Sequence, residues 1–403
     1  MSSVAPGTFD RQWAELAGIG RQRQTGGYRR YALTPEDHDL RAWFAGEATR
    51  RGLDLTTDRM GNQWAWWGDP DTAPGIVTGS HLDSVPDGGA YDGPLGVVSA
   101  FAALDRLRAD GFEPLRALGV VNFSDEEGAR FGVACAGSRV ITGALPAERA
   151  LGLRDGDGIT MAEALRSAGR EPELLGPDPE TLRRVGAFIE LHVEQGRGLI
   201  DLGQPVALGT DIWPHGRWRL EFAGEANHAG TTRLVDRQDA MIGLAATVLA
   251  ARSAATAHGC VATVGKTVIV PGGVNAIPSA ATGWLDARGA DEEAVRRTVA
   301  EVTSAATTWG AVVAEESWTP TTRFDLELLG QLRRVLPDAP LLGTGAGHDA
   351  GILAGAGIPT GMIFVRNPTG ISHSPAEFAE RDDCVAGVAA LADVLAELTG
   401  DRR

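Results

Sequence analysis

The fold is decided by residues 75–93, which read GIVTGSHLDSVPDGGAYDG. The first five residues form a short apolar run, typical of a strand that is buried on both faces. Polar residues follow at once, and residues 95–108 then place apolar side chains at the i, i+3, i+4, i+7 spacing of one helix face. A buried strand that leads into a helix is the repeating unit of a layered α/β domain. Residues 75–108 therefore predict a sheet covered by helices.

The same pattern recurs twice further along the chain. Residues 117–123 (ALGVVNF) read as a second buried strand, which runs into three acidic residues at 125–127. Residues 187–191 (AFIEL) read as a third strand, which ends at His192. Open α/β sheets place their sites at the carboxyl ends of their strands. We therefore expect the functional side chains to gather at one edge of this sheet.

A different pattern begins near residue 209. Residues 218–222 (WRLEF) alternate like a half-exposed antiparallel strand, and the following segments predict a helix, two strands and a second helix, at 239–255, 263–270, 284–288 and 291–307. Strand–helix alternation returns from residue 340. These changes predict a catalytic α/β/α sandwich with an inserted smaller α+β domain. The expected parts are residues 1–208 and 323–403 for the catalytic domain and 209–322 for the insertion.

Composition and charge exclude several classes of protein. The 403 residues carry a net charge of −16, which disfavours a general affinity for nucleic acid or an anionic membrane surface. Three scattered cysteines do not make a disulfide framework. Residues 1–11 lack the basic and apolar segments of a signal peptide, and no stretch reaches 18 uninterrupted apolar residues. We expect a cytoplasmic protein with no nucleic-acid or membrane partner.

The first candidate site lies in the string that follows the strand at 75–79. His81 and Asp92 are ligand types for a divalent metal. Asp83 could accept the second ring N–H of His81 and so determine its tautomer. The alternative is a turn without chemistry, because Asp-Gly and Gly-Gly pairs are also typical of turns.

Three further strings carry ligand types. Residues 124–128 (SDEEG) alone would form a solvated turn or a helix N-terminus, and His192 or His373 alone would more often be structural. Beside two metals, however, one of the adjacent carboxylates could bind metal while the other takes a proton from water. Taken together, three histidines and two or three carboxylates at probable strand ends provide enough ligands for two metals with open positions.

Six strings carry a specific resemblance to a known family. They appear in the expected order between positions 79 and 377: GSHLDSVPDGGAYDG, SDEEGARFG, LHVEQG, GEANHAGTT, GVNAIPS and GISHSPAE. The chain resembles the M20-type metal-dependent amidohydrolases, and within them the branch of N-carbamoyl-L-amino-acid hydrolases and allantoate amidohydrolases.

The resemblance implies two divalent metal ions, drawn from Zn, Mn, Co or Ni. It assigns five residues to them: His81 and His192 on one metal each, Asp92 as the bridge, and Glu127 and His373 completing the two sets. The mixed imidazole and carboxylate ligands do not select among these metals.

The same resemblance implies roles in catalysis. Glu126 would be the general base that deprotonates the bridging water and later protonates the leaving nitrogen. Two divalent cations lower the pKa of water sharply, so a carboxylate suffices as the base at neutral pH. We group Asp83 with Glu126 as a catalytic candidate, because it would hold the metal ligand His81.

The inserted domain resembles the family's lid and dimerisation domain. His228 and Asn275 match positions that polarise the scissile carbonyl and bind substrate, and Gln195 matches one that contacts the ureido or carboxylate part. Arg288 matches the arginine that clamps the substrate carboxylate, a task that suits a guanidinium. In this family the residue matching His228 can reach the neighbouring subunit's site, so we expect a homodimer. The alternative to these substrate-binding roles is that His228 only stabilises its loop and that Arg288 is an ordinary surface charge.

Two segments depart from the family pattern, and one histidine that matches it has no assigned role. Arg233–Leu234 replaces the Pro–Met of many relatives, and residues 212–217 are bulkier and more polar than the common hinge. Trp213 and His215 either pack the hinge or line the pocket. His348, in GAGHDAG, matches a family string but has no assigned role.

The sequence therefore predicts a hydrolase that cleaves the terminal carbamoyl group of a ureido acid, allantoate or an N-carbamoyl-L-amino acid, and releases ammonia and carbon dioxide. The enzymatic alternative is an N-acyl-L-amino-acid deacylase or dipeptidase with the same metal centre. The alternative of another class is an inactive binding homologue. Such a homologue would lack a ligand or Glu126, and every expected position is filled.

Overall fold

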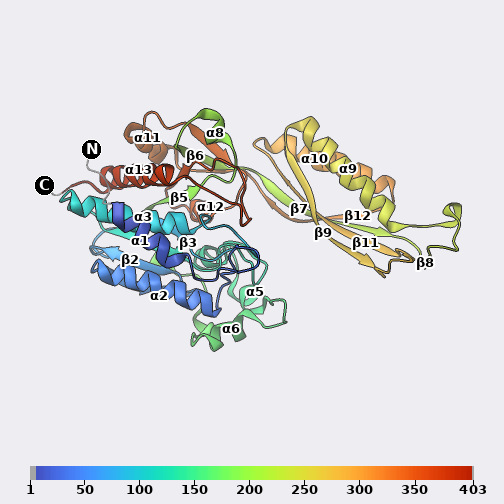
Figure 1. Ribbon diagram of the computed structural model, residues 1–403, viewed down its shortest axis with the longest axis horizontal. Helices are drawn as coiled ribbons and strands as arrows, with labels where there is room; N and C mark the ends of the chain where they lie inside the picture. The colour runs from blue at the N-terminus through green and yellow to red at the C-terminus, as the bar shows by residue number, and fades with distance from the viewer. Residues whose placement is uncertain (1–5, 402–403) are drawn as a thin grey trace. The chain divides into compact units, whose positions relative to one another are not determined.

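The computed structural model describes residues 6–401, which form two compact units (Figure 1). The large unit comprises residues 6–210, 323–342 and 347–401, and the small unit comprises residues 211–322 and 343–346. The break points lie within two residues of those expected from the sequence. The short segment 343–346 differs, because we expected it in the second part of the catalytic domain.

Segment 343–346 belongs to the small unit because Trp213 and Arg288 hold its backbone. The Trp213 N–H donates to the carbonyl of Thr344 at 2.8 Å, and Nη1 of Arg288 donates to the carbonyl of Gly345 at 2.8 Å. The indole of Trp213 also lies so close to the first glycine of the segment that a Cβ there would clash. Such contacts join segments far apart in the chain, so no local pattern predicts them.

A mixed sheet forms the centre of the large unit. Its strands follow the order β1 (Asp54–Thr57), β2 (Gln63–Trp67), β4 (Leu118–Phe123), β3 (Gly75–His81), β5 (Val185–Val193), β15 (Thr360–Val365), β6 (Val206–Ile212) and β13 (Thr322–Arg323), with β14 (Leu341–Thr344) paired to β6. Strands β4, β3, β5 and β15 run parallel, whereas β2 and β6 pair antiparallel with their neighbours β4 and β15. The parallel strands are buried almost throughout, as continuous apolar runs require.

Helices cover this sheet. They are α1 (Pro6–Leu16), α2 (Pro35–Arg50), α3 (Pro94–Ala109), α4 (Ala136–Thr142), α5 (Ala147–Gly152), α6 (Met161–Ser167), α7 (Pro179–Leu182), α8 (Gly198–Leu202), α11 (Leu326–Val335), α12 (Asp349–Gly355) and α13 (Arg381–Thr399), with a 3₁₀ turn η1 (Pro172–Leu174). One hydrophobic core joins α1, α2, α3, α11 and α13 to the sheet. Helix α3 matches the predicted helix to within one residue at each end, and β3, β4 and β5 are the three predicted buried strands.

The small unit is an antiparallel sheet covered by two helices on one face (Figure 1). The strand order is β12 (Val312–Thr319), β7 (His215–Ala223), β11 (Ala280–Arg288) and β9 (Val261–Val270), and the helices are α9 (Ala240–His258) and α10 (Glu292–Thr308). Two-residue strands β8 (Asn227–His228) and β10 (Ala276–Ile277) pair separately, and η2 (Leu234–Asp236) follows β8. The predicted α/β fold with an inserted smaller domain is confirmed.

Strand β12 has no counterpart among the predicted elements. It lies at the edge of the sheet, and its residues VVAEESWT are exposed or half-buried. Alternating burial is the usual mark of a strand in sequence, and an edge strand that is partly solvated shows it weakly.

Helix α9 is long and apolar enough to cross a membrane, judged by length and composition alone. In its most apolar window 39% of the residues are buried, and Leu244, Ala251 and Ala254 belong to the core of the small unit. A core helix of a globular domain meets the same criterion. The hydropathy of α9 therefore does not distinguish a membrane-spanning helix from a core helix.

Candidate metal centre

Three of the buried strands end at one edge of the large sheet. Strand β3 ends at His81, β5 carries His192 next to its last residue, and β4 ends at Phe123, just before the acidic run 125–127. Because these strands are parallel neighbours, their carboxyl ends meet. The gathering of ligand-type side chains expected from the sequence therefore occurs.

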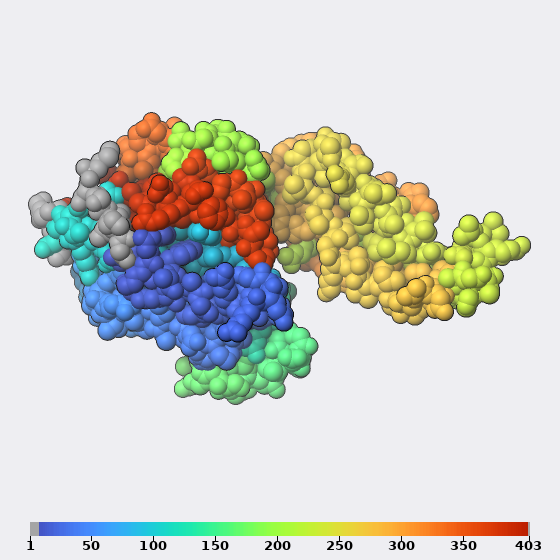
Figure 2. Space-filling view, viewed as in Figure 1, coloured from blue at the N-terminus to red at the C-terminus, as the bar shows by residue number. Residues whose placement is uncertain are grey.

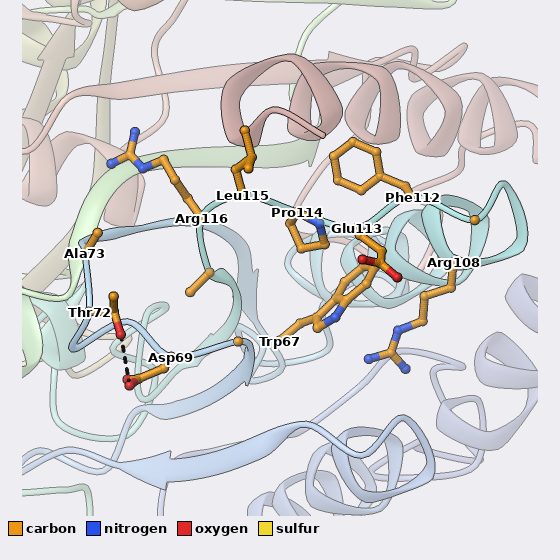
Figure 3. A pocket seen from close by; sticks show the side chains of 13 residues that line it. Trp67, Asp69, Thr72, Ala73, Arg108, Phe112, Glu113, Pro114, Leu115 and Arg116 are labelled. Atoms are coloured by element: carbon orange, nitrogen blue, oxygen red, sulfur yellow. Dashed lines mark hydrogen bonds between the residues drawn. The ribbon is translucent and has the colours of Figure 1, made fainter. Parts of the chain in front are cut away.

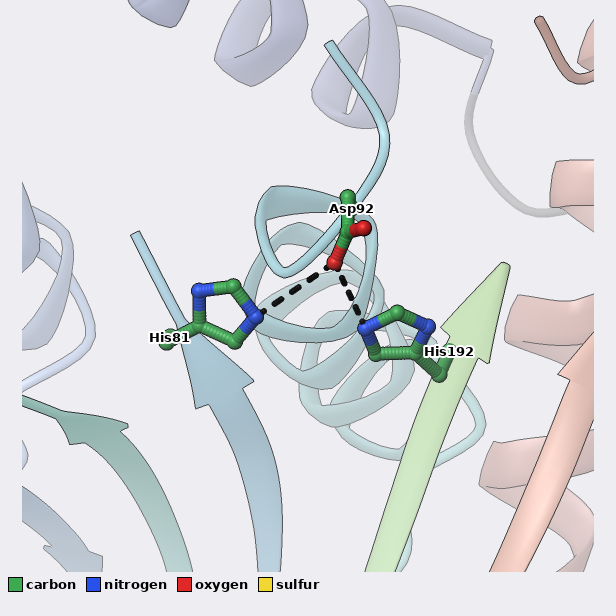
Figure 4. A group of neighbouring side chains, drawn as sticks. All are labelled: His81, Asp92 and His192. Carbon is green, nitrogen blue, oxygen red and sulfur yellow. Dashed lines mark ion pairs between the residues drawn. The ribbon is translucent and has the colours of Figure 1, made fainter. Parts of the chain in front are cut away.

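The first ligand group is His81, Asp92 and His192 (Figure 4). Oδ1 of Asp92 lies 3.6 Å from Nε2 of His81 and 3.1 Å from Nε2 of His192. All three side chains are buried. Burial acts to raise the pKa of Asp92, but the imidazoles around it hold that pKa well below its usual range.

Backbone carbonyl oxygens orient the imidazole rings of His81 and His192. Nδ1 of His81 lies 3.2 Å from the carbonyl oxygen of Asp83 and 3.3 Å from its carboxylate, and Nδ1 of His192 lies 2.9 Å from the carbonyl oxygen of Val193. A ring that donates from Nδ1 has its lone pair on Nε2. Both lone pairs then face Asp92.

The second ligand group is Asp92, Glu127 and His373. Nε2 of His373 lies 3.4 Å from Oδ2 of Asp92 and 3.6 Å from Oε2 of Glu127. Asp92 thus offers one oxygen to each group. His81 and His192 lie together on one side of Asp92 in this grouping, whereas the resemblance assigned them to one metal each.

The donor atoms fit divalent metal ions. Ligands about 2.1 Å from a tetrahedral metal lie about 3.4 Å from one another, and the nitrogen–oxygen distances here run from 3.1 to 3.6 Å. Among residues 6–401, no hydrogen bond reaches the buried Nε2 of His192, although Oδ1 of Asp92 lies 3.1 Å away, as expected of an atom whose lone pair is kept for a metal. The first group is enclosed, whereas the His373 side chain is 52% exposed, so the second group is the more open one.

Asp83 and Glu126 lie beside the ligands. The carboxylate of Asp83 accepts the backbone N–H of Glu126 at 3.2 Å and that of Glu127 at 3.0 Å. It therefore orients both acidic residues as well as His81. Oε2 of Glu126 lies 3.8 Å from Nε2 of His81, and burial, supported by the charge of Asp349, raises the pKa of Glu126 well above its usual range. A carboxyl group of raised pKa next to metal ligands can accept and return a proton.

Gln195 contacts the ligand shared by the two groups. Its Nε2 donates to Oδ2 of Asp92 at 2.8 Å and to Oγ of Ser372 at 3.0 Å. In this structure it supports the shared ligand.

Sequence reasoning missed Glu377, although it lies in the quoted string GISHSPAE. This buried carboxylate accepts the backbone N–H groups of Tyr91 and Asp92 at 2.8 and 3.0 Å, and it approaches Gly89 so closely that a Cβ there would clash. Glu377 thereby holds the loop that carries the shared ligand. The sequence around His373 gives no sign of this, because the contact with Asp92 spans 285 residues.

His348 lies next to the first ligand group. It is 3% exposed, and its ring meets that of His192 edge to face with centroids 4.5 Å apart. With His192 and Glu190 it makes a third group of ligand types, but both oxygens of Glu190 already accept hydrogen bonds, from Ser80 and from the backbone of Ala350.

The three remaining predicted residues belong to the small unit. His228 and Asn275 are exposed neighbours, because β8 pairs with β10 and the N–H of Ala229 donates to the carbonyl of Asn275 at 2.9 Å. Nδ1 of His228 accepts the N–H of Gly230 at 3.0 Å, so the ring proton of the neutral form lies on Nε2.

Arg288 lies at the opposite end of β11 from this pair. Its Nε and Nη2 donate to the two carboxylate oxygens of Asp286 at 2.6 and 2.8 Å. Nine-residue β11 is about 26 Å long at about 3.3 Å per residue, and it separates Arg288 from the His228–Asn275 end.

A depression in the large unit lies away from these ligand groups (Figure 3). It has a volume of about 480 Å³ and is lined by Trp67, Arg108, Phe112 and Arg116, near the amino-terminal ends of β3 and β4. None of the predicted site residues lines it. The ligand-type side chains, and not this depression, therefore mark the candidate site.

Comparison with known proteins agrees with this geometry. The chain is 35% identical over 95% of its length to the N-carbamoyl-L-amino acid amidohydrolase of Geobacillus stearothermophilus, of which it covers 96%. It is 30% identical to the allantoate amidohydrolase of Escherichia coli, with 93% of each chain covered. The crystal structure of AtUAH in complex with glyoxylate superimposes with a TM-score of 0.87 at 29% identity, covering 99% of this chain and 98% of that one.

Residues 77–397 match the sequence profile of peptidase family M20/M25/M40, whose members generally use divalent metals. That range includes all five metal-ligand candidates and Glu126. The ligand groups at the strand ends, the inserted unit and this match together show that the chain is a hydrolase of the M20/M25/M40 family.

Proposed function

We propose that this chain hydrolyses the terminal carbamoyl group of a ureido acid. The overall change is R–NH–CO–NH₂ + H₂O to R–NH₂ + NH₃ + CO₂. The single observation that carries the proposal is the pair of ligand groups that share Asp92, with Glu126 beside them. The names of the two amidohydrolases that resemble the chain along almost its whole length support a ureido substrate.

The residues of the two ligand groups would hold two divalent cations, which supply Lewis-acid polarisation and lower the pKa of water. Glu126 would take a proton from the attacking water and deliver it to the leaving nitrogen. Asp83 keeps this carboxylate in place through the backbone of residues 126 and 127. Glu377, Gln195 and Ser372 hold the shared ligand.

In the same proposal, small-unit residues bind the substrate. Nε2–H of His228 is a suitable donor to the scissile carbonyl, because Nδ1 is already an acceptor. Arg288 would bind the substrate carboxylate through the N–H groups that Asp286 and Gly345 leave free. Asn275, beside His228, would hydrogen-bond the ureido group.

We also propose a homodimer. Arg288 and His228 are separated by the length of β11, about 26 Å, which is more than a ureido acid can span. A second copy would provide one of the two residues, and the segment after β8 projects from the small unit with Leu234 and Val235 more than 80% exposed (Figure 2). Helix α9 also exposes apolar side chains, at Met241, Ile242, Val248 and Leu249.

Ammonia release tests the proposed reaction. Metal-reconstituted protein is assayed with allantoate, N-carbamoyl-L-amino acids and N-acetyl-L-amino acids, with a chelated sample as the control. We expect metal-dependent ammonia from at least one ureido acid. Free amino acid from the acetyl series without ammonia would instead support the deacylase alternative.

The Glu126→Gln variant tests the assignment of the base. We expect metal content to stay at the wild-type level and kcat to fall about 10³-fold, within the range of general acid–base catalysis. An exposed control, Glu113→Gln, should leave kcat unchanged. Wild-type turnover in Glu126→Gln would show that another group carries the proton.

A further inference from the structure

Cys135 contacts Glu126 twice. Its Sγ lies 3.2 Å from Oε1 of Glu126, and its backbone N–H donates to the carbonyl of Glu126 at 2.5 Å. Both residues are buried, with 2% and 6% of their surface exposed. The thiol is therefore tied to the backbone and to the carboxylate of the same residue.

The loop between these residues is built to bring them together. Residues 126–135 leave β4 and return to the start of α4, and the N–H of Ala136 donates to the carbonyl of Asp125 at 3.0 Å. Asp125 and Cys135 both adopt left-handed backbone conformations, with φ of 55° and 54°. Non-glycine residues keep such conformations only where the surroundings impose them. The contact between Cys135 and Glu126 is thus a feature of the closed loop.

The two oxygens of Glu126 have different surroundings. Within residues 6–401, the Cys135 thiol is the hydrogen-bond donor that reaches this carboxylate, and it reaches Oε1. Oε2 faces the ligand group, 3.8 Å from Nε2 of His81. Burial raises the pKa of the Cys135 thiol well above its usual range, so it remains protonated and able to donate.

We propose that Cys135 is a positioning residue that holds Oε1 of Glu126 through its S–H group and so presents Oε2 to the reacting water. The catalytic part of this inference rests on the proposed function, whereas the hydrogen bond itself does not. A thiol is a weak donor. It restrains the rotamer of the carboxylate, which would otherwise have no side-chain partner on that side.

The alternative is that Cys135 only fills space as a small apolar residue, which is the usual role of a buried free cysteine. Two substitutions separate the readings. Cys135→Ala removes the donor, and Cys135→Ser keeps a donor at the same place. Cys384→Ala is a matched control, because that thiol is also buried and belongs to α13.

The first experiment is infrared spectroscopy of the S–H stretch in the metal-free full chain. The Cys135 band is identified by its loss in Cys135→Ala, with Cys384→Ala removing a different band. We expect the Cys135 band to lie at lower frequency than a free thiol and to move to higher frequency in Glu126→Leu, which removes the acceptor. An unchanged band in Glu126→Leu would overturn the inference.

The second experiment is steady-state kinetics of the metal-loaded variants on the best ureido acid. We expect Cys135→Ala to lower kcat about fivefold, the size of one ordinary hydrogen bond, with KM and metal content unchanged. Cys135→Ser should recover most of kcat, and Cys384→Ala should match the wild type. Equal kcat in all variants, or equal losses in Ala and Ser with altered metal content, would show a packing role only.

The two experiments distinguish a failure of the proposed function from a failure of the inference about Cys135. A wild-type chain without activity on any ureido acid would overturn the proposed function, while the infrared band would still decide whether the thiol holds the carboxylate. A shifted band together with unchanged kinetics would retain the hydrogen bond and overturn its positioning role.

Discussion

His81 and His192 of the large unit are 1% exposed, whereas His228 of the small unit is exposed. The first two lie on long buried strands, and carbonyl oxygens orient their rings. His228 lies on a two-residue strand that pairs only with β10. Metal ligands must be pre-oriented, and burial in a packed sheet does this. The proposed substrate-binding role of His228, which remains in solvent, requires another surface to enclose the substrate, and the proposed second copy of the chain would provide it.

The largest effect is expected from a substitution among the buried ligands of the large unit. Asp92→Ala removes the one residue common to both ligand groups, so it should abolish binding of both metals and lower kcat/KM by about 10³-fold or more. His373→Ala removes a ligand of the second group only and should retain one metal per chain. Metal content by elemental analysis checks both. Equal losses in the two variants would contradict the shared position of Asp92.

The next largest effect is expected from substitutions of His228 and Arg288 in the small unit. His228→Ala and Arg288→Ala should each lower kcat/KM about 10²-fold, because each removes a strong hydrogen bond to the substrate. If the two residues at one site come from different copies, mixing the variants and allowing subunits to exchange should restore about a quarter of wild-type activity in a twofold-symmetric dimer. Each variant alone is the control. No recovery after verified exchange would place both residues of one site on the same chain.

A smaller effect concerns the stability of the metal-free chain. Burial raises the pKa of Glu377 to about 7, so the folded chain keeps this group protonated where the unfolded chain has ionised it. Stability should therefore be highest near pH 5 and fall as the pH rises toward 7, with a share on the order of 2 kcal/mol from this group. Above that range its contribution is constant.

Thermal unfolding of chelated protein between pH 5 and 8 measures this dependence. Glu377→Gln should show a flatter profile than the wild type, because a neutral amide can still accept the N–H groups of Tyr91 and Asp92. The exposed variant Glu113→Gln should keep the wild-type slope. A wild-type slope in Glu377→Gln would assign the pH dependence to other buried acids, such as Asp349, whose pKa burial raises to about 8.

Much of the fold and of the site follows from local sequence. The apolar runs before His81, Asp125 and His192 predict three strands, because strands buried on both faces must be continuously apolar. Parallel strands bring their carboxyl ends together, so the ligand-type residues after them are expected to meet. The half-exposed edge strand β12 lacks such a pattern and is missed.

Sequence by itself thus determined the α/β class, the insertion near residue 209 and the residue types that converge. Only the tertiary structure decided how these residues are arranged and which partners each of them contacts. It placed His81 and His192 on one side of Asp92, engaged Gln195 with that same carboxylate, and paired Arg288 with Asp286. The contacts of Cys135 with Glu126 and of Glu377 with the Asp92 loop belong to the same class. Strand patterns depend on neighbours in sequence, whereas these contacts depend on which side chains meet once distant segments have packed, and that is a property of the folded chain alone.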